Sequence, residues 1–311
     1  MVQRKISANF GIFGQTDIMI KRLILLLLCL MPLVRAVAQY YDTGQDPASL
    51  KWSQIRTPHF QVIYPDNFSA EAQKYARLLE ESYSELSVLY PLAKTHMPVI
   101  IHNYSMESNG YVTWAPRRME LFPLPGQNNL PMDPAKQLAV HETAHVLQLS
   151  SLNKKGFGKA LGYIFGEQFV GLSVLEIPQW ALEGDAVYAE TVTGLSGRGR
   201  SNAFTQEARA LAATPEGIYR YDKMLSGSYK DFTPDHYVFG YLMMNNLRNL
   251  NGETWANAIT EVAKGYAANP LNHVLKKEVG LTKKKIFDST FHDLAEMWND
   301  SSSANYTDYT A

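Results

Sequence analysis

The feature that most constrains this 311-residue chain is the segment His141-Glu142-Thr143-Ala144-His145, which lies inside an apolar run. Asp133 followed by Pro134 predicts the start of a helix that continues through this segment without a breaker. Helical residues four positions apart share one face, so both imidazoles can reach a single metal ion. Glu142 would then lie beside that ion, where it can act as a general base toward a water molecule.

The same pattern also fits an ordinary helix that happens to carry two histidines. The surrounding residues argue against this reading because they predict a buried helix. The apolar neighbours are Leu138, Val140, Val146, Leu147 and Leu149. Two imidazoles and a carboxylate are costly to bury unless a ligand satisfies them.

A catalytic zinc site usually has three protein ligands and an open fourth position. Pro178 predicts the start of a second helix, and Glu183 lies in the middle of its apolar face. Glu176 and Glu190 are the rival ligands. Glu176 precedes the proline and is expected outside the helix, whereas Glu190 is expected to have a structural or supporting role. Asp185 is a candidate to orient a ligand histidine through its free ring nitrogen.

The small residues Gly184 and Ala186 predict that the second helix approaches the first one closely.

Together, His-Glu-x-x-His and a Pro-x-Trp-x-x-Glu-Gly-x-Ala-x-Tyr segment about forty residues later resemble the gluzincin metallopeptidases. More narrowly, they resemble exported bacterial peptidase domains that precede a TolB-like β-propeller. The looser resemblance extends from about His59 to Trp298. The position four residues after the glutamate, where the family often has an acidic residue, is Val187.

The resemblance implies that His141, His145 and Glu183 are zinc ligands and that Glu142 is the base. It also implies a residue that hydrogen-bonds the developing oxyanion, which gluzincins take from a tyrosine or a histidine. A Tyr-x-x-Gly-Tyr pattern begins at Tyr237 and resembles the family helix beside the zinc site. Tyr237 is the candidate and His236 the substitute; a helix-start histidine and a packed tyrosine are the plain alternative.

Residues 1–38 are expected to be a secretory signal peptide. Lys21-Arg22 precede the apolar stretch Leu23 to Val34, and Ala36-Val37-Ala38 supplies a cleavage site. Met19 is a possible true start, and a retained N-terminal anchor is the alternative. Cys29 is the only cysteine and lies in this segment, so the exported protein needs no disulfide and would bind zinc through nitrogen and oxygen. We expect a periplasmic or extracellular, cell-envelope protein without a stable membrane span after cleavage.

Residues 39–300 are expected to form one α+β domain, with a small, mostly N-terminal sheet packed on a helical region and the active-site helix between them. Residues 40–56 are expected to be a loose lead-in, and 301–311 a polar tail or the start of a linker. The strongest patterns predict strands at His59–Tyr64 and Pro98–His102, and helices at Ser69–Tyr90, Pro178–Glu190, Glu207–Ala213, Asp231–Leu247, Thr254–Lys264 and Thr282–Trp298. Asn269-Pro270 predicts a shorter helix start.

Asn109-Gly110 is a turn signal between the early strands and two further strand candidates, residues 111–114 and 118–122. In gluzincins the edge strand before the active-site helix binds extended peptide through its main chain, and either segment fits that role. A plain antiparallel pair is the alternative. The apolar stretch from Leu161 to Leu175 is expected to be a core helix or a flap over the zinc site, or alternatively a membrane-surface contact.

The formal net charge of −1, without a basic cluster interleaved with aromatic residues, gives no reason to expect nucleic acid binding. The predicted function is zinc-dependent hydrolysis of a peptide or protein substrate. One alternative is a catalytically silent zinc-binding scaffold of the cell envelope, and another is a zinc hydrolase of a non-peptide bond. A β-propeller domain or partner is a further expectation from the resemblance.

Overall fold

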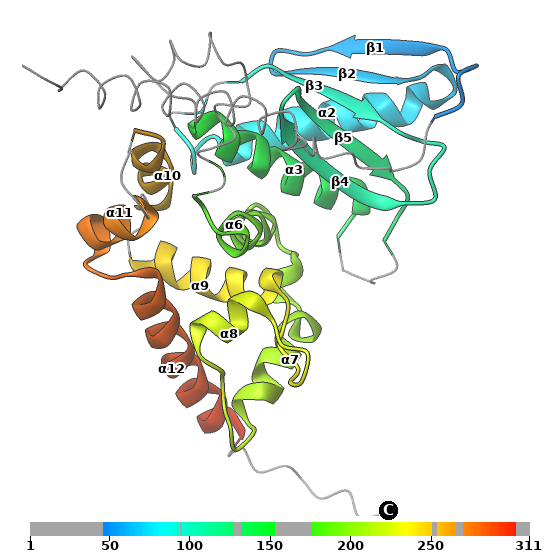
Figure 1. Ribbon diagram of the computed structural model, residues 1–311. Coiled ribbons are helices and arrows are strands. Elements are labelled where there is room, and N and C mark those ends of the chain that lie inside the picture. The colour runs from blue at the N-terminus through cyan, green and yellow to red at the C-terminus, as the bar shows by residue number, and fades with distance from the viewer. Residues whose placement is uncertain are drawn as a thin grey trace, which may run out of the picture. The chain divides into compact units, whose positions relative to one another are not determined.

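The computed structural model describes residues 46–91, 93, 95–126, 132–152, 174, 176–250, 254–264 and 270–302. These residues form an α+β fold in which a five-stranded mixed sheet is followed by a mostly helical region (Figure 1), as the sequence predicts. The strands are β1 (Trp52–Arg56), β2 (Phe60–Pro65), β3 (Met97–Ile101), β4 (Ser108–Trp114) and β5 (Arg117–Pro123). Their order across the sheet is β1-β2-β3-β5-β4.

The central strands are parallel and the outer pairs are antiparallel. β2 pairs with β3, and β3 with β5, in the parallel sense, whereas β1 and β4 run antiparallel to their neighbours. Helix α2 (Ser69–Leu86) connects β2 to β3, since parallel neighbours need a crossover connection. β4 is therefore the edge strand next to β5, and of the two candidate segments only 111–114 lies at an edge.

Two expectations about this region are wrong. The segment expected as a loose lead-in contains β1, whose polar and half-exposed residues lack the apolar alternation that marks a buried strand. The Asn109-Gly110 pair does not form a turn but lies inside β4, opposite Phe122 and Leu121 of β5. Tertiary pairing overrides the local turn preference at this dipeptide.

Apart from α8, the remaining helices overlap the segments that the sequence predicts as helical. They are α3 (Pro134–Ser151), α6 (Gln179–Val192), α7 (Asn202–Ala212), α8 (Tyr221–Ser226), α9 (His236–Leu250), α10 (Thr254–Lys264), α11 (Pro270–Val279) and α12 (Lys283–Ser302), with short 3-10 turns η1 (Asp66–Phe68) and η2 (Arg198–Arg200). The predicted helix Thr254–Lys264 is present as α10. α2 ends four residues earlier than expected, and its N-cap is Phe68 rather than Ser69. The short helix α8 was not expected.

Helix α3 lies between two hydrophobic cores. Asp133 caps it as predicted, because its Oδ1 accepts a hydrogen bond from the Ala135 amide at 2.9 Å. Ala139 and Val146 pack into the core beneath the sheet together with α2. Val140, Ala144 and Leu147 pack into the core of the helical region. Burial on both sides fixes the orientation of α3, and with it the direction of every polar side chain that it carries.

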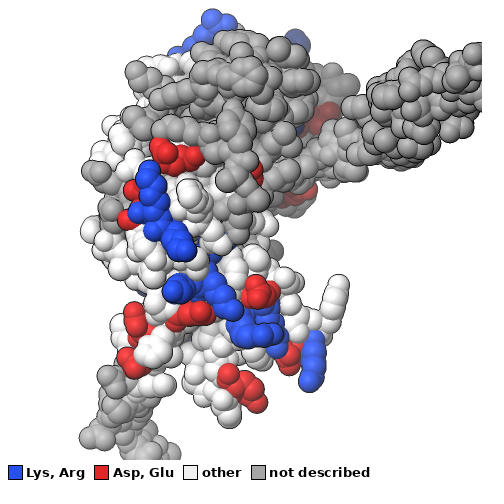
Figure 2. Space-filling model, turned by 60° about the vertical axis from the view of Figure 1, so that its left-hand side comes forward, with Lys and Arg blue, Asp and Glu red and all other residues white. Residues whose placement is uncertain are grey.

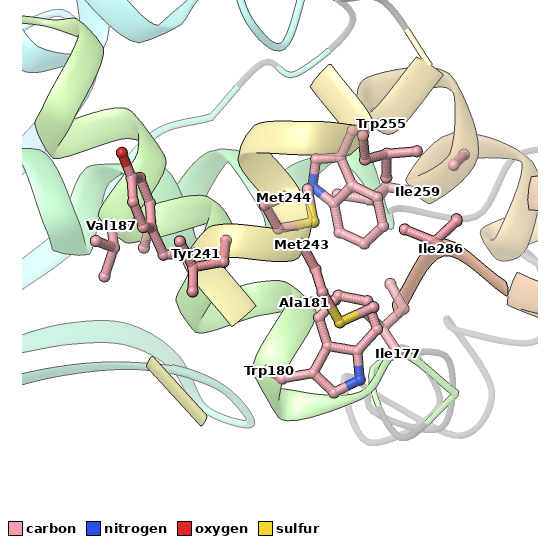
Figure 3. Packing of buried hydrophobic residues seen from close by; sticks show 14 of the residues in the cluster. Ile177, Trp180, Ala181, Val187, Tyr241, Met243, Met244, Trp255, Ile259 and Ile286 are labelled. Carbon is pink, nitrogen blue, oxygen red and sulfur yellow. The ribbon is translucent and has the colours of Figure 1, made fainter. Parts of the chain in front are cut away.

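The sheet core consists of alternate residues of the central strands and the facing side of α2. Its fully or almost fully buried members include Phe60, Val62, Tyr64, Ala72, Tyr75, Ala76, Leu79, Met97, Val99, Ile101, Met119 and Leu121. The helical core gathers side chains from α6, α9, α10 and α12, among them Trp180, Met243, Met244, Trp255, Ile259 and Ile286 (Figure 3). Burial of this much apolar surface, at about 25 cal/mol per Å², is the main stabilising term for both cores.

Within the described residues, no helix combines the length and hydropathy that a membrane span requires. The face in Figure 2 carries basic side chains with acidic side chains beside them. The predicted signal peptide (1–38), the stretch 161–175 apart from Val174, and the tail from 303 onward lie outside the described residues.

Candidate metal centre

Three ligand atoms from two helices meet at one point. His141 and His145 lie one turn apart on α3, and Glu183 lies on α6. The Nε2 atoms of the two imidazoles are 3.2 Å apart, and each is 3.2 Å from Oε2 of Glu183. Among the described residues, this is the one cluster of histidine and carboxylate side chains arranged so that it could hold a metal ion.

The three equal distances have a chemical meaning. A neutral imidazole carries one N–H, and in both histidines that N–H lies at Nδ1, toward the Glu190 carboxylate in His141 and toward the Gln148 carbonyl oxygen in His145, so both Nε2 atoms present lone pairs to the Glu183 oxygen. A cation at the centre satisfies all three lone pairs at once. The arrangement therefore fits a metal ion that is bound by two neutral histidines and one carboxylate.

Glu190 binds the ring nitrogen of His141 that points away from the ligand cluster. Its Oε1 lies 2.7 Å from Nδ1 of His141, so the imidazole donates its N–H to Glu190 and presents Nε2 to the ligand cluster. Glu190 is fully buried and accepts two further hydrogen bonds from Arg198 of η2, through Nη2 and, at 3.0 Å, through Nε. Burial opposes ionisation of Glu190, but Arg198 and His141 together outweigh burial and lower its pKa to about 2.

His145 is held by a different group. Its Nδ1 lies 2.9 Å from Oε1 of Gln148, one turn along α3. The Gln148 amide donates to the Leu182 carbonyl and to Oδ2 of Asp185, both at 3.0 Å. Because an amide oxygen accepts and an amide NH2 donates, this arrangement fixes which ring nitrogen of His145 carries the proton.

Asp185 does not contact a ring nitrogen of a ligand histidine, so the predicted direct role is wrong. Its carboxylate instead accepts hydrogen bonds from Arg248 of α9 at 2.9 and 2.6 Å, from the Tyr90 hydroxyl, and from Gln148. Asp185 and Arg248 are both buried. These hydrogen bonds of Asp185 connect α6 to Gln148 of α3 and to Arg248 of α9. Asp185 is linked to His145 through Gln148.

The ligands carry the charges expected of a cation site. For Glu183, burial opposes ionisation, but the neighbouring His145 and His141 outweigh burial and lower its pKa well below the ordinary range. For His141, burial favours the neutral form, but hydrogen bonds to Glu183 and Glu190 raise its pKa to about 9. The cluster thus favours positive charge at the centre of the three ligand atoms.

Glu142 lies beside the cluster and is almost completely buried, with 2% of its surface exposed. Its Oε2 has no hydrogen-bond partner within the described part of the chain. Burial raises the pKa of this carboxyl, although the nearby charges of His141 and His145 act in the opposite direction. A buried carboxyl without a partner has a high affinity for a proton, which is the property of a general base.

Tyr237 borders the cluster from the first turn of α9. Its ring centroid is 6.2 Å from that of His141, and the Arg198 guanidinium lies 5.2 Å from the Tyr237 ring centroid. Burial and the negative charge of Glu183 raise its pKa, so the phenol keeps its proton. His236 packs against Tyr237 at 4.6 Å between ring centroids, and its Nε2 is buried without a partner in the described part of the chain. His236 is not part of the ligand cluster.

Of the rival ligands, Glu176 lies outside α6 as expected, and Glu190 has the supporting role. The sequence analysis missed Arg198, Gln148 and Arg248. Gln148 follows His145 by three residues on the same helix. That spacing places the two side chains on one face, so the contact could have been predicted from the sequence. Arg198 and Arg248 reach their partners through tertiary contacts that leave no local pattern.

Comparisons with known proteins add no identification. No model of a known protein family matches this chain. A search of curated proteins likewise finds no match.

Proposed function

We propose that this protein is an exported zinc metallopeptidase that hydrolyses a peptide bond of a peptide or protein substrate. The observation that carries the proposal is the triangle of ligand atoms with 3.2 Å sides, with a buried carboxyl beside it. A tetrahedral zinc ion with bonds of about 2.0–2.1 Å separates its ligands by about 3.3 Å. Two histidines and one carboxylate also form the ligand set of many hydrolytic zinc sites.

When bound, zinc supplies Lewis acidity that polarises a carbonyl and lowers the pKa of a water molecule. Glu142 takes a proton from the attacking water as the new carbon–oxygen bond forms. It then delivers that proton to the amide nitrogen as the carbon–nitrogen bond breaks, which leaves a carboxylic acid and an amine; transfer of the acid proton to the amine gives the carboxylate and ammonium products. The raised pKa of Glu142 favours both steps, because the group must accept and then release the same proton near neutral pH.

Tyr237 is proposed to donate a hydrogen bond to the carbonyl oxygen as negative charge develops on it. Its raised pKa keeps the donor protonated. Its neighbour His236 is the alternative donor. Support for Tyr237 comes from its interaction with Glu183, which brings the phenol to the ligand cluster.

The substrate is proposed to bind in extended form along β4. This strand is at the edge of the sheet formed by the described residues and packs against α3, and its residue Gly110 faces Glu142. An edge strand recognises extended peptide through main-chain hydrogen bonds.

Export through residues 1–38 and a β-propeller partner are parts of the proposal that rest on the sequence. N-terminal sequencing of the mature protein from the periplasm or medium tests export.

The test is hydrolysis of a mixed quenched-fluorescence peptide library by wild type and Glu142→Gln, with the zinc content of both measured. We expect about one zinc per chain in both proteins and cleavage by the wild type alone, with a loss of at least about 10²-fold in the variant. Zinc binding without cleavage in either protein would favour a scaffold or a hydrolase of another bond. Absence of zinc from both would contradict the site itself.

A further inference from the structure

Gly110 lies in the middle of β4 and faces Glu142. A Cβ atom added at Gly110 would lie 2.7 Å from Oε1 of Glu142 and 2.8 Å from both Cγ and Cδ of that side chain. Non-bonded carbon atoms pack at about 3.5–4.0 Å, so an alanine here overlaps three atoms of the Glu142 side chain. Glycine at this position leaves the space that the Glu142 side chain fills.

The backbone gives no other reason for a glycine. Gly110 is not among the described glycines with positive φ, which are Gly217, Gly227 and Gly280. It lies in regular pairing opposite Leu121 of β5. Glycine in the interior of a strand is less favourable than alanine, because it loses more conformational freedom on folding. Among the described residues, the three atoms nearest to an added Cβ all belong to Glu142, and this contact explains a residue without a side chain here.

Packing has to help orient Glu142, because one of its two carboxylate oxygens has no hydrogen bond within the described residues. Its Oε2 has no hydrogen-bond partner within the described residues, although the carboxyl is buried. Its neighbours on α3, His141 and His145, present their ring nitrogens to Glu183 and to their own supporting groups. The surface of β4 at Gly110 therefore limits where the carboxylate can lie.

We infer that Gly110 is a positioning residue for the general base: the missing side chain on the edge strand forms the slot that holds the Glu142 carboxylate beside the metal ligands. The inference rests on the proposed function for its catalytic consequence, but the packing contact itself does not. Gly110 is neither a metal ligand nor a reacting group itself, and its proposed effect on catalysis is exerted through its contact with Glu142.

The first test is kinetic. Gly110→Ala is expected to retain zinc and to keep KM within about threefold of wild type, while kcat falls by about 10²-fold or more because the base is displaced. Gly126→Ala is the matched control, since an added Cβ there lies 3.4 Å from the nearest atom, Oγ of Ser108. The control should retain wild-type kcat. Wild-type kcat in Gly110→Ala would overturn the inference.

The second test needs neither activity nor metal. In the metal-free protein, Gly110→Ala is expected to lower Tm by about 3–8 °C when Glu142 is present. In a Glu142→Ala background, which removes all three overlapping atoms, the same substitution should change Tm by less than about 1 °C. Equal losses of Tm in the two backgrounds would overturn the contact. If the wild type cleaves no peptide, the proposed function fails, and this double-mutant cycle still decides the role of Gly110.

Discussion

Gly184 of α6 and Gly240 of α9 touch where the two helices cross. A Cβ atom at Gly184 would lie 2.2 Å from the carbonyl carbon of Gly240, and one at Gly240 would lie 2.2 Å from the carbonyl oxygen of Trp180. The sequence analysis expected Gly184 to allow close approach to α3, whereas the glycine faces α9. This backbone contact brings Tyr237, which precedes Gly240 by less than one turn, up to Glu183, the neighbour of Gly184.

Gly184→Ala is therefore expected to force α6 and α9 apart. Because the overlapping atoms belong to the backbone, they cannot move aside, and we expect a loss of about 1–3 kcal/mol in the free energy of unfolding. Urea unfolding measures this loss. Gly194→Ala is the control, since its nearest neighbour would be 3.6 Å away. Equal stability of the two variants would contradict the close crossing.

Gln148→Met is expected to weaken metal binding without unfolding the protein. Methionine has a similar length but cannot accept the Nδ1–H of His145, so the imidazole loses the group that fixes its orientation. Loss of such a supporting contact typically costs about 10–100-fold in metal affinity. Competition with a chromophoric chelator measures zinc affinity, and Gln206→Met on the exposed side of α7 serves as the control. Unchanged affinity in Gln148→Met would show that this contact does not support the site.

Tyr237→Phe is expected to lower kcat by about 10²-fold or more, with zinc content and KM little changed. The substitution removes one hydrogen-bond donor that acts on the developing negative charge. Steady-state kinetics with a peptide taken from the library separates kcat from KM. His236→Phe is measured in parallel: a large loss there, together with a normal Tyr237→Phe, would assign the role to His236 instead.

His102 predicts a pH-dependent contribution to stability outside the metal centre. Its Nδ1 lies 2.6 Å from Asp46 and its Nε2 lies 3.1 Å from Glu120 of β5. Burial favours the neutral imidazole, but the two carboxylates outweigh burial and raise its pKa above the ordinary 6.5. The stabilisation is therefore complete below about pH 6.5 and is lost as pH rises through the raised pKa.

Urea unfolding between pH 6 and pH 9 tests this expectation. The difference in unfolding free energy between wild type and His102→Gln should shrink as pH rises, because the glutamine carries no charge at any of these values. Arg118 also pairs with Glu120. Curves that stay parallel would contradict a charged His102 in the folded protein.

The sequence predicts much of the fold and the ligand cluster because local patterns specify both. The i, i+4 spacing of His141 and His145 is a property of one helix, and Pro178 places Glu183 inside the next. β1 was missed because its pairing with β2, rather than its own apolar pattern, makes it a strand. The Asn109-Gly110 pair was misassigned as a turn because the glycine makes room for the Glu142 side chain. Only the folded chain creates this contact.

Most of the contacts that support the metal ligands could not be predicted from the sequence, because they also join residues that only folding brings together. Asp185 meets Arg248 across 63 positions of sequence and Tyr90 across 95. Glu190 could be identified as a supporting residue because it lies on the same helix as Glu183. Its partner Arg198 lies in a glycine-rich segment, where no helical or strand periodicity indicates which way a side chain points.

The most direct test of the central claim is anomalous diffraction at the zinc edge from crystals of the zinc-loaded protein. The account predicts one strong peak at about 2.0–2.1 Å from Nε2 of His141, Nε2 of His145 and Oε2 of Glu183. No peak at this position, or a peak bound by other residues, would contradict the account.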